Sequence, residues 1–255
     1  MLAERVVIVS GVGPGLGRDL ARACLTHGAK VTLVARSNER LRAIDDELGG
    51  ETLCVAANVS NADAADSVVS RTLDRFGTID GLVNNAAVIP PFASLADAPV
   101  IDVVASMDAN FYTALHLSRA VAPTMVQHQR GSIVMVNSAV VRHPKPLFGA
   151  YNVAKHAMLG LARSLALELG PAGVRVNTLA PGKIAGERLD SYFVLRANEL
   201  GVSVESIRDD YAARLALRRI PSSEEYADVA VFLLSDLSRA VTGHTLDVNG
   251  GEYFD

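Results

Sequence analysis

Short runs of consecutive apolar residues alternate along the chain with longer segments in which apolar residues recur every three or four positions. The first pattern is typical of strands buried on both faces, and the second is typical of amphipathic helices. The apolar runs predict strands at 6–9, 31–34, 52–56, 81–84, 132–136, 174–179 and 245–248. The periodic segments predict helices at about 16–27, 41–48, 64–76, 101–121, 151–169 and 226–234, with Gly28 and Gly49-Gly50 ending the first two.

This alternation predicts an α/β fold with a doubly wound parallel sheet and helices on both faces. No linker, repeat or low-complexity tract divides the chain, so residues 1–255 are predicted to form a single dinucleotide-binding and catalytic domain. The rhythm breaks only at 183–219, a long segment of mixed composition between two strands. Within it, residues about 186–217 are predicted to form a substrate lid; an ordinary helical insertion or a subunit contact would show the same pattern.

Composition narrows the classes of partner. Apolar residues make up 49% of the 255 residues and the net charge is −4, so neither a nucleic acid nor an anionic membrane is expected as a partner. The apolar runs are shorter than the ~20 residues of a membrane span, and the N-terminus lacks the features of a secretory signal. Cys24 and Cys54 lack the spacing of metal ligands, and the histidines are scattered. We therefore expect a cytoplasmic protein with reduced thiols and no metal site.

A glycine-rich turn follows the first predicted strand and opens the first predicted helix. Gly11, Gly15 and Gly17 lie in it. Glycine permits a tight turn and a close backbone approach, and the free amides at the start of a helix attract a pyrophosphate. This context predicts a Rossmann-type dinucleotide site; a glycine-rich turn without a ligand is the alternative.

The end of the second predicted strand bears on the choice of cofactor. Ala35 and Arg36 stand where an NAD site carries the acid that binds the ribose hydroxyls. Arg36 would instead form a charge-assisted pair with a 2′-phosphate. We therefore favour NADP(H) over NAD(H). The alternative is that Arg36 stacks on adenine or faces solvent and that NAD(H) binds.

Tyr151 and Lys155 stand four residues apart in a segment with apolar residues at helical spacing, so both side chains lie on one face of the predicted helix. A phenol with its ordinary pKa of about 10 is a poor acid–base group near neutrality, and a neighbouring ammonium lowers that pKa. The pair would then exchange a proton with an alcohol or a ketone. Ser138 lies thirteen residues upstream. On its own, the pair also suits two unrelated surface residues.

These motifs together resemble those of the short-chain dehydrogenase/reductase family, along essentially the whole chain. The matching motifs are Gly-x-x-x-Gly-x-Gly at 11–17, Asn-Asn-Ala at 84–86, Asn110, Ser138, Tyr-x-x-x-Lys at 151–155 and Pro-Gly at 181–182. The resemblance implies an NAD(P)-dependent oxidoreductase that interconverts a secondary alcohol and a ketone. It also favours a homotetramer.

The resemblance implies a role for each matched residue. Tyr151 would be the acid–base catalyst, and Lys155 would lower its pKa and hold the nicotinamide ribose. Ser138 would hydrogen-bond the reacting oxygen, and Asn110 would hold a water that links Lys155 to solvent. Pro181 and Gly182 would form the wall beside the nicotinamide. The cofactor-binding residues would be Gly11, Gly15, Leu16, Gly17, Arg36, Asn58, Val59, Asn85, Ala86, Tyr151, Lys155, Pro181, Gly182 and Ile184.

The chain departs from the family pattern at positions that do not carry catalysis. Asn58 replaces an aspartate that contacts adenine, and its amide would still accept the same bond. Ala87 replaces a glycine, and Ser10 replaces a threonine while keeping the hydroxyl. Gly186 stands near the position of a threonine that binds the nicotinamide carboxamide, so that contact is in question.

The substrate class depends on side chains outside these motifs. Aromatic residues favour a small or alicyclic hydrophobic alcohol or ketone, although each also suits a core or interface position: Phe92, Phe148, Tyr192 and Phe193. The helices at 101–121 and 151–169 carry more apolar positions than one buried stripe requires, and part of this excess would face another subunit or simply the sheet.

Two other functions suit the same fold. A reductase of 3-oxoacyl chains on an acidic acyl carrier protein would need a basic patch, for which Arg142, His143 and Lys145 are candidates. A non-catalytic nucleotide-sensing protein would retain the fold alone, and the intact Ser138 and Tyr151 argue against it.

Overall fold

The structure, a computed structural model, describes residues 1–254 and contains a seven-stranded sheet in the order β3-β2-β1-β4-β5-β6-β7. All neighbouring strands run parallel. The strands are β1 (Val6–Ser10), β2 (Lys30–Ala35), β3 (Thr52–Ala56), β4 (Gly81–Asn84), β5 (Gly131–Val136), β6 (Val174–Pro181) and β7 (Thr245–Val248). The order reverses between β1 and β4, as in a doubly wound sheet, so the predicted fold class is confirmed. The predicted domain extends to Asp255, which lies outside the described residues.

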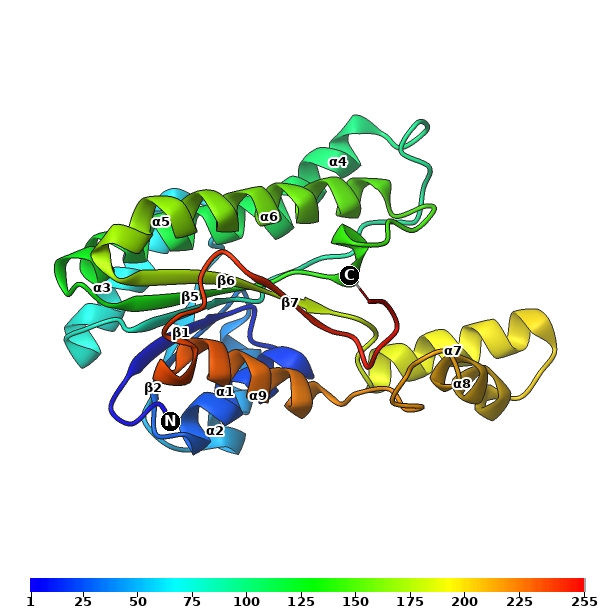
Figure 1. Cartoon of the computed structure of the whole chain (residues 1–255), viewed down its shortest axis with the longest axis horizontal. Helices are drawn as coiled ribbons and strands as arrows, with labels where there is room; N and C mark the ends of the chain where they lie inside the picture. The colour runs from blue at the N-terminus through cyan, green and yellow to red at the C-terminus, as the bar shows by residue number, and fades with distance from the viewer. Residues whose placement is uncertain (255) are drawn as a thin grey trace.

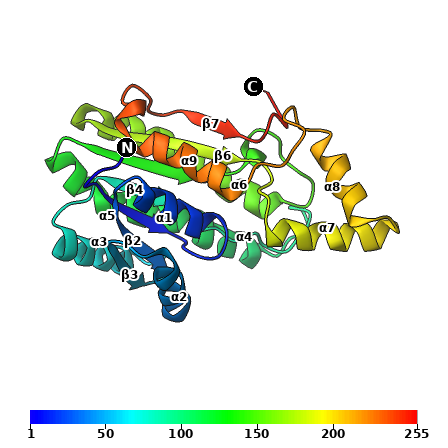
Figure 2. The ribbon, with the colours of Figure 1, turned by 90° about the horizontal axis from the view of Figure 1, so that it is seen from below.

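Helices cover both faces of the sheet (Figure 1). In Figure 1 α1, α2 and α9 lie below it, while α5 and α6 lie above it; Figure 2 shows the first group from below. The α-helices are α1 (Leu16–Thr26), α2 (Asn38–Leu48), α3 (Ala62–Phe76), α4 (Val100–Met107), α5 (Thr113–Gln127), α6 (Gly149–Leu169), α7 (Glu187–Leu200), α8 (Val204–Ala212) and α9 (Ser223–Leu234). A π-helical segment η1 (Asp108–Tyr112) and short 3-10 helices η2 (Ala139–Val141), η3 (Gly170–Ala172) and η4 (Asp236–Ser238) complete the fold.

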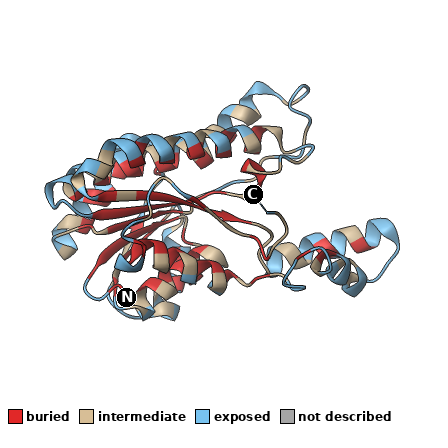
Figure 3. Ribbon diagram, viewed as in Figure 1, coloured by how far each residue is buried: buried red, intermediate tan, exposed pale blue. Residues whose placement is uncertain are grey.

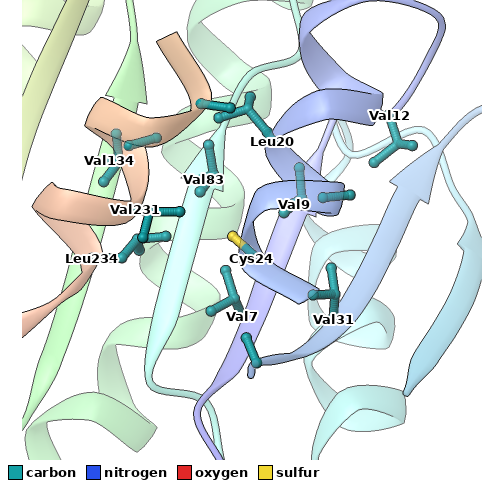
Figure 4. Close-up of a cluster of buried hydrophobic side chains, with 14 of the residues drawn as sticks. Val7, Val9, Val12, Leu20, Cys24, Val31, Val83, Val134, Val231 and Leu234 are labelled. Carbon is teal, nitrogen blue, oxygen red and sulfur yellow. The ribbon is translucent and has the colours of Figure 1, made fainter. Parts of the chain in front are cut away.

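The apolar runs of the sequence are explained by two hydrophobic clusters, one on each face of the sheet. In β1, Val7 and Val9 pack into the cluster with α1 and α9, and Ile8 packs into the cluster with α3, α5 and α6. Figure 4 shows the first cluster, where Cys24 of α1 faces the strands. Successive strand side chains point to opposite faces, so a strand covered on both sides is apolar at every position. The buried residues in Figure 3 form the corresponding central band.

Helix starts differ from the predicted ones where a polar first turn carries a cap. Helix α2 begins at Asn38, because the side chain of Ser37 accepts a hydrogen bond from the amide of Arg40. Helix α9 begins at Ser223 after a capping box formed by Ser222 and Glu225. The spacing of apolar residues does not reveal these polar first turns, so the predicted helices began too late.

The helix predicted at 101–121 is longer and less regular than its periodicity indicates. It runs from α4 through η1 to the end of α5 at Gln127, and the middle segment is a π-helix. A π-helical turn inserts one extra residue, which a period of 3.6 does not reveal, and such turns are frequent at functional sites. Asn110 lies in this segment.

The segment predicted as a lid consists of α7 and α8, which extend beyond the edge where the strands end (Figures 1 and 2). Its small hydrophobic cluster is formed by Phe193, Tyr211 and Leu215. Phe193 was a candidate for lining a substrate pocket, but it is a core residue of this helix pair with 1% of its surface exposed. No helix within residues 1–254 has the length and hydropathy of a membrane span.

Candidate active site

The glycine turn and the Asn-Asn-Ala motif meet at the carboxyl ends of β1 and β4. The Asn85 side chain donates a hydrogen bond to the carbonyl of Gly11 over 2.9 Å. A Cβ on Gly11 would overlap the backbone of Ala86, and a Cβ on Gly17 would overlap the carbonyl of Gly11. Two of the predicted cofactor motifs thus form one tightly packed turn, and glycine is required there by contact with backbone.

Gly15 serves a different purpose in the same turn. It precedes α1 with φ 86°, and no side chain caps the first turn of the helix. No heavy atom lies within 4 Å of the place where a Cβ on Gly13 or Gly15 would stand. The uncapped amides beside this open space fit a pyrophosphate, which the start of a helix attracts. Leu16, the first residue of α1, packs against the core.

The predicted adenosine-binding residues lie at the ends of neighbouring strands. Arg36 follows β2 directly and is exposed. Asn58 follows β3, is exposed and accepts a hydrogen bond from the Ser60 hydroxyl. Val59 is a core residue rather than an exposed one. Arg36 is therefore the charged side chain among the predicted adenosine contacts.

The predicted nicotinamide wall follows β6. Pro181 is buried as the last residue of that strand, and the amide of Gly182 donates to the carbonyl of Val248 over 3.1 Å. Ile184 packs against the hydrophobic cluster of the α1 and α9 face. Gly186 is the N-cap residue of α7 and has a φ of 145°, a conformation that disfavours the threonine of the family pattern.

Ser138, Tyr151 and Lys155 lie together where β5 ends and α6 begins. The hydroxyl of Ser138 hydrogen-bonds the phenol of Tyr151. Lys155 is fully buried, and its Nζ donates to the carbonyl of Val136 over 3.0 Å. The same Nζ lies 5.6 Å from the centre of the Tyr151 ring. The structure thus brings together three of the four predicted catalytic side chains.

Burial changes the expected electrostatics of this group. Burial raises the pKa of Tyr151, while the hydrogen bond from Ser138 and the positive charge of Arg188 act in the opposite direction. Burial also lowers the pKa of Lys155 to about 7. Ser138 and Arg188 are thus the groups that oppose burial at Tyr151, and the effect of Lys155 on the pKa of this phenol stays a prediction.

Asn110 is held next to this group by the π-helical segment. Its Nδ2 donates to the carbonyls of Val88 and Ser106 over 2.8 and 2.9 Å, and its Oδ1 accepts from the amide of Val88 over 3.2 Å. The hydroxyl of Ser106 in turn donates to the carbonyl of Ala150 in α6. Asn110 therefore fastens the loop after β4 to the helix, and none of its hydrogen bonds in residues 1–254 reaches Lys155.

Two residues near the site were not among the predicted site residues. Asn137 is buried, and its side chain donates to the carbonyl of Lys155 over 3.0 Å, which fixes α6 against the end of β5. Arg188, in the first turn of α7, places its charge near Tyr151. A buried asparagine that follows an apolar strand is the trace that could have revealed Asn137, whereas Arg188 comes close only through folding.

The basic patch considered for an acyl carrier protein is neutralised by acidic partners. Arg142 pairs with Asp247 at 3.1 Å, and Lys145 lies 3.8 Å from Glu252. The ring of His143 stacks on Tyr253 with 3.8 Å between ring centres. These charges are committed within the chain, so the loop is not a free cationic surface.

Two cavities of the structure lie away from these residues. One of about 150 Å³ lies between α1 and α9, and one of about 250 Å³ lies at the amino ends of β5 and β6. Neither is lined by a predicted site residue. Within residues 1–254, no cluster of histidine, cysteine and acidic side chains is arranged to hold a metal.

Comparison with known proteins agrees with this geometry. A family profile described as enoyl-(acyl carrier protein) reductase matches residues 11–252. Human dehydrogenase/reductase SDR family member 4 is 34% identical, across 98% of this chain and 88% of that protein. The chain belongs to the short-chain dehydrogenase/reductase family.

L-rhamnose 1-dehydrogenase (NAD(P)(+)) of Azotobacter vinelandii is 32% identical, across 98% of this chain and 97% of that protein. The crystal structure of an NAD+-bound xylitol dehydrogenase matches with a TM-score of 0.90 and 27% identity, covering 98% of this chain and 99% of that one. The protein is thus an oxidoreductase of a family that uses a nicotinamide dinucleotide.

Proposed function

We propose that this protein is an NAD(P)-dependent oxidoreductase that interconverts a secondary alcohol and a ketone, with Tyr151 as the acid–base group. The observation that carries the proposal is the hydrogen bond between Ser138 and Tyr151, with Lys155 one helical turn away. These side chains lie at the same edge of the sheet as the glycine turn, where ligands of doubly wound sheets bind.

The nicotinamide cofactor, when bound, supplies the hydride donor or acceptor. The glycine turn would hold its pyrophosphate, and Lys155 would hold the nicotinamide ribose. The remaining contacts would come from Leu16, Arg36, Asn58, Val59, Asn85, Ala86, Pro181, Gly182 and Ile184.

Tyr151 would move the proton between its Oη and the reacting oxygen. In ketone reduction the phenol donates, and in alcohol oxidation the phenolate accepts. Burial raises the pKa of Tyr151 and so favours the protonated phenol, the form needed for reduction. Ser138 would donate a hydrogen bond to the same oxygen as negative charge develops on it, and such fixed donors act strongly in a desolvated site.

Arg36 supports NADP(H) as the preferred cofactor. The side chain is exposed directly after β2, and no acid of β2 stands where it would repel a 2′-phosphate. Arg36 would pair with that phosphate through charge-assisted hydrogen bonds. The xylitol dehydrogenase was solved with NAD+ bound, but its sequence is 27% identical to this chain, so its cofactor does not decide the preference here.

A reductase of carrier-bound acyl chains has less support, although the description of the matching family profile names an acyl carrier protein. The candidate docking residues Arg142 and Lys145 are paired with Asp247 and Glu252. An acidic carrier would have to compete with these internal acids.

The test is the variant Tyr151→Phe, assayed at the nicotinamide absorbance with a panel of alcohols and ketones and both cofactors. We expect kcat to fall by about 10²–10⁴-fold, the usual contribution of a general acid–base group. The Kd of the cofactor should stay close to that of the wild type. The matched control is Tyr112→Phe, which removes an exposed hydroxyl from η1. Near-full kcat in Tyr151→Phe would overturn the proposal.

A further inference from the structure

Three distant parts of the chain meet beside the end of β6 in a polar cluster that the proposed reaction does not use. His143 comes from the loop after η2, Tyr211 from α8, and Glu252 and Tyr253 from the segment after β7. His143 stacks on Tyr253, whose hydroxyl donates to Oε1 of Glu252 over 3.1 Å. Lys145 approaches the same Oε1 at 3.8 Å. One carboxylate oxygen of Glu252 is therefore anchored.

The other polar atoms of this cluster are buried, and the contact between the Tyr211 phenol and the Glu252 carboxylate does not have the geometry of a normal hydrogen bond. Within residues 1–254, Oε2 of Glu252, the hydroxyl of Tyr211 and Nε2 of His143 have no hydrogen-bond partner of normal geometry. The phenol of Tyr211 and the carboxylate do interact: burial and then this carboxylate raise the pKa of Tyr211. Leaving a buried polar group unpaired destabilises the folded protein, because the group has lost its hydrogen bonds to water. Three such atoms together indicate the polar groups of a ligand.

The cluster lies against the predicted nicotinamide wall. A Cβ on Gly182 would stand 3.3 Å from Oε2 of Glu252, so this oxygen faces the residue that directly follows β6. Backbone hydrogen bonds from Ala216 and Leu217 to Gly251 and Gly250 tie the C-terminal segment to the end of the α7–α8 excursion. The cluster thus lies between Gly182, a predicted cofactor-binding residue, and the end of the α7–α8 excursion, the segment predicted to cover the substrate.

Within residues 1–254, Lys183 is not within ion-pair distance of Glu252, although the charge of that carboxylate acts to raise the pKa of Lys183. Its Nζ lies 4.3 Å from the ring centre of Tyr211 and 4.6 Å from that of Tyr192, which is cation–π geometry. Burial lowers the pKa of Lys183, and the nearby charge of Lys145 lowers it further. The ammonium covers one face of the Tyr211 ring, and the rings of His143 and Tyr253 stack on each other.

We infer that His143, Tyr211 and Glu252 form a hydroxyl-recognition subsite and that the substrate is a polyhydroxylated alcohol or ketone. This inference rests on the proposed function. A carboxylate oxygen accepts from a hydroxyl, and a phenol and an imidazole both donate and accept, so neighbouring hydroxyls would pair with all three groups. An apolar substrate would leave them buried and unpaired. The aromatic residues of the sequence favoured a small hydrophobic alcohol as the substrate. The cluster favours a substrate with several hydroxyls instead.

The experiment compares substrates with one carbon skeleton, cyclohexanol against 1,2-cyclohexanediol, together with xylitol and a 3-hydroxy acid. We expect the wild type to favour the diol over cyclohexanol by at least about tenfold in kcat/KM, because a site built to bind a hydroxyl discriminates against the analogue that lacks it. Tyr211→Phe and Glu252→Gln should each reduce this ratio about tenfold or more, mainly through KM. Glu205→Gln, an exposed acid of α8, is the matched control and should keep the ratio.

The outcomes separate this inference from the proposed function. Three outcomes would overturn the inference: equal kcat/KM for cyclohexanol and the diol, a ratio unchanged in Tyr211→Phe and Glu252→Gln, or a preference for the hydroxy acid. In each case the proposed function would stand if turnover still depends on Tyr151. The inference would also be overturned if both variants had a higher Kd for the cofactor but kept the substrate ratio of the wild type. The cluster would then belong to the nicotinamide site. Thermal unfolding of each variant identifies misfolded protein, and Tyr211→Phe keeps the ring that packs in the cluster of Phe193.

Discussion

At the scale of single residues, the proton chemistry depends on what surrounds one phenol. The hydrogen bond from Ser138 lowers the pKa of Tyr151 against the opposing effect of burial. Removing that bond in Ser138→Ala should therefore raise the pKa of Tyr151. Alcohol oxidation needs the phenolate, so its rise in kcat/KM with pH should move to higher pH, and kcat should fall by about 10²–10³-fold, as when one such donor is removed.

The measurement is the pH profile of kcat/KM for alcohol oxidation in wild type, Ser138→Ala and Ser138→Thr. The threonine variant keeps a hydroxyl and should keep a profile closer to that of the wild type. A profile of Ser138→Ala that is unshifted, or shifted to lower pH, would contradict this account of Tyr151.

Arg36 decides the cofactor at the same scale. Arg36→Asp replaces a positive charge with a negative one directly after β2. The aspartate would repel a 2′-phosphate and would accept hydrogen bonds from the ribose hydroxyls of NAD(H). We expect the ratio of kcat/KM for NADP(H) over NAD(H) to exceed one in the wild type and to fall by about 100-fold or more, which corresponds to roughly 3 kcal/mol. Arg40→Asp, on the exposed first turn of α2, is the charge-matched control. A wild type with the higher kcat/KM for NAD(H) would remove this assignment.

At the scale of elements, the turn between β1 and α1 is fastened to the end of β4. Gly11→Ala would force a Cβ into the backbone of Ala86 at φ 73°. The free energy of unfolding should fall by about 3 kcal/mol, from backbone strain and overpacking together. Gly13→Ala, where no atom lies within 4 Å, should change it by less than about 0.5 kcal/mol. Urea unfolding without cofactor measures both, and equal effects would refute the packing argument.

The α7–α8 excursion is the element that we propose as a lid. It has a hydrophobic cluster separate from the two clusters of the sheet, so it can move as a folded unit. Hydrogen exchange should show its amides less protected than those of β1 and β4, with protection rising when NADP+ and a substrate are added. Helix α9, packed on the sheet, serves as the internal reference. Protection equal to that of the central strands, and unchanged by ligand, would make the excursion fixed structure.

At the scale of the whole molecule, the outer sides of α4 and α6 leave apolar side chains in solvent. Ile101 is 68% exposed and Leu167 is 81% exposed. We propose that these surfaces meet other copies of the chain in a homotetramer. Light scattering at micromolar concentration should give four times the chain mass of 26.9 kDa. Ile101→Glu should lower this mass, whereas Leu237→Glu, an exposed apolar position on η4, should not. A monomeric wild type would exclude the assembly.

Much of the architecture follows from the sequence by itself. The strands at 52–56, 81–84 and 245–248 have the predicted bounds, because turn residues flank short apolar runs. The glycine turn, Ser138, Tyr151 and Lys155 were also recognisable. Their spacing places each at the end of a strand or on one helical face, and parallel strands bring such ends to one edge of the sheet.

Only the tertiary structure decided the environment of these groups. Burial of Lys155 opposes its positive charge, and pairing with Asp247 and Glu252 removes the cationic loop; neither can be inferred from local spacing. The meeting of His143, Tyr211 and Glu252 is likewise invisible in the sequence, because three separate elements contribute it. Local pattern determines which element a residue joins, whereas solvation and pairing depend on contacts between residues far apart along the chain.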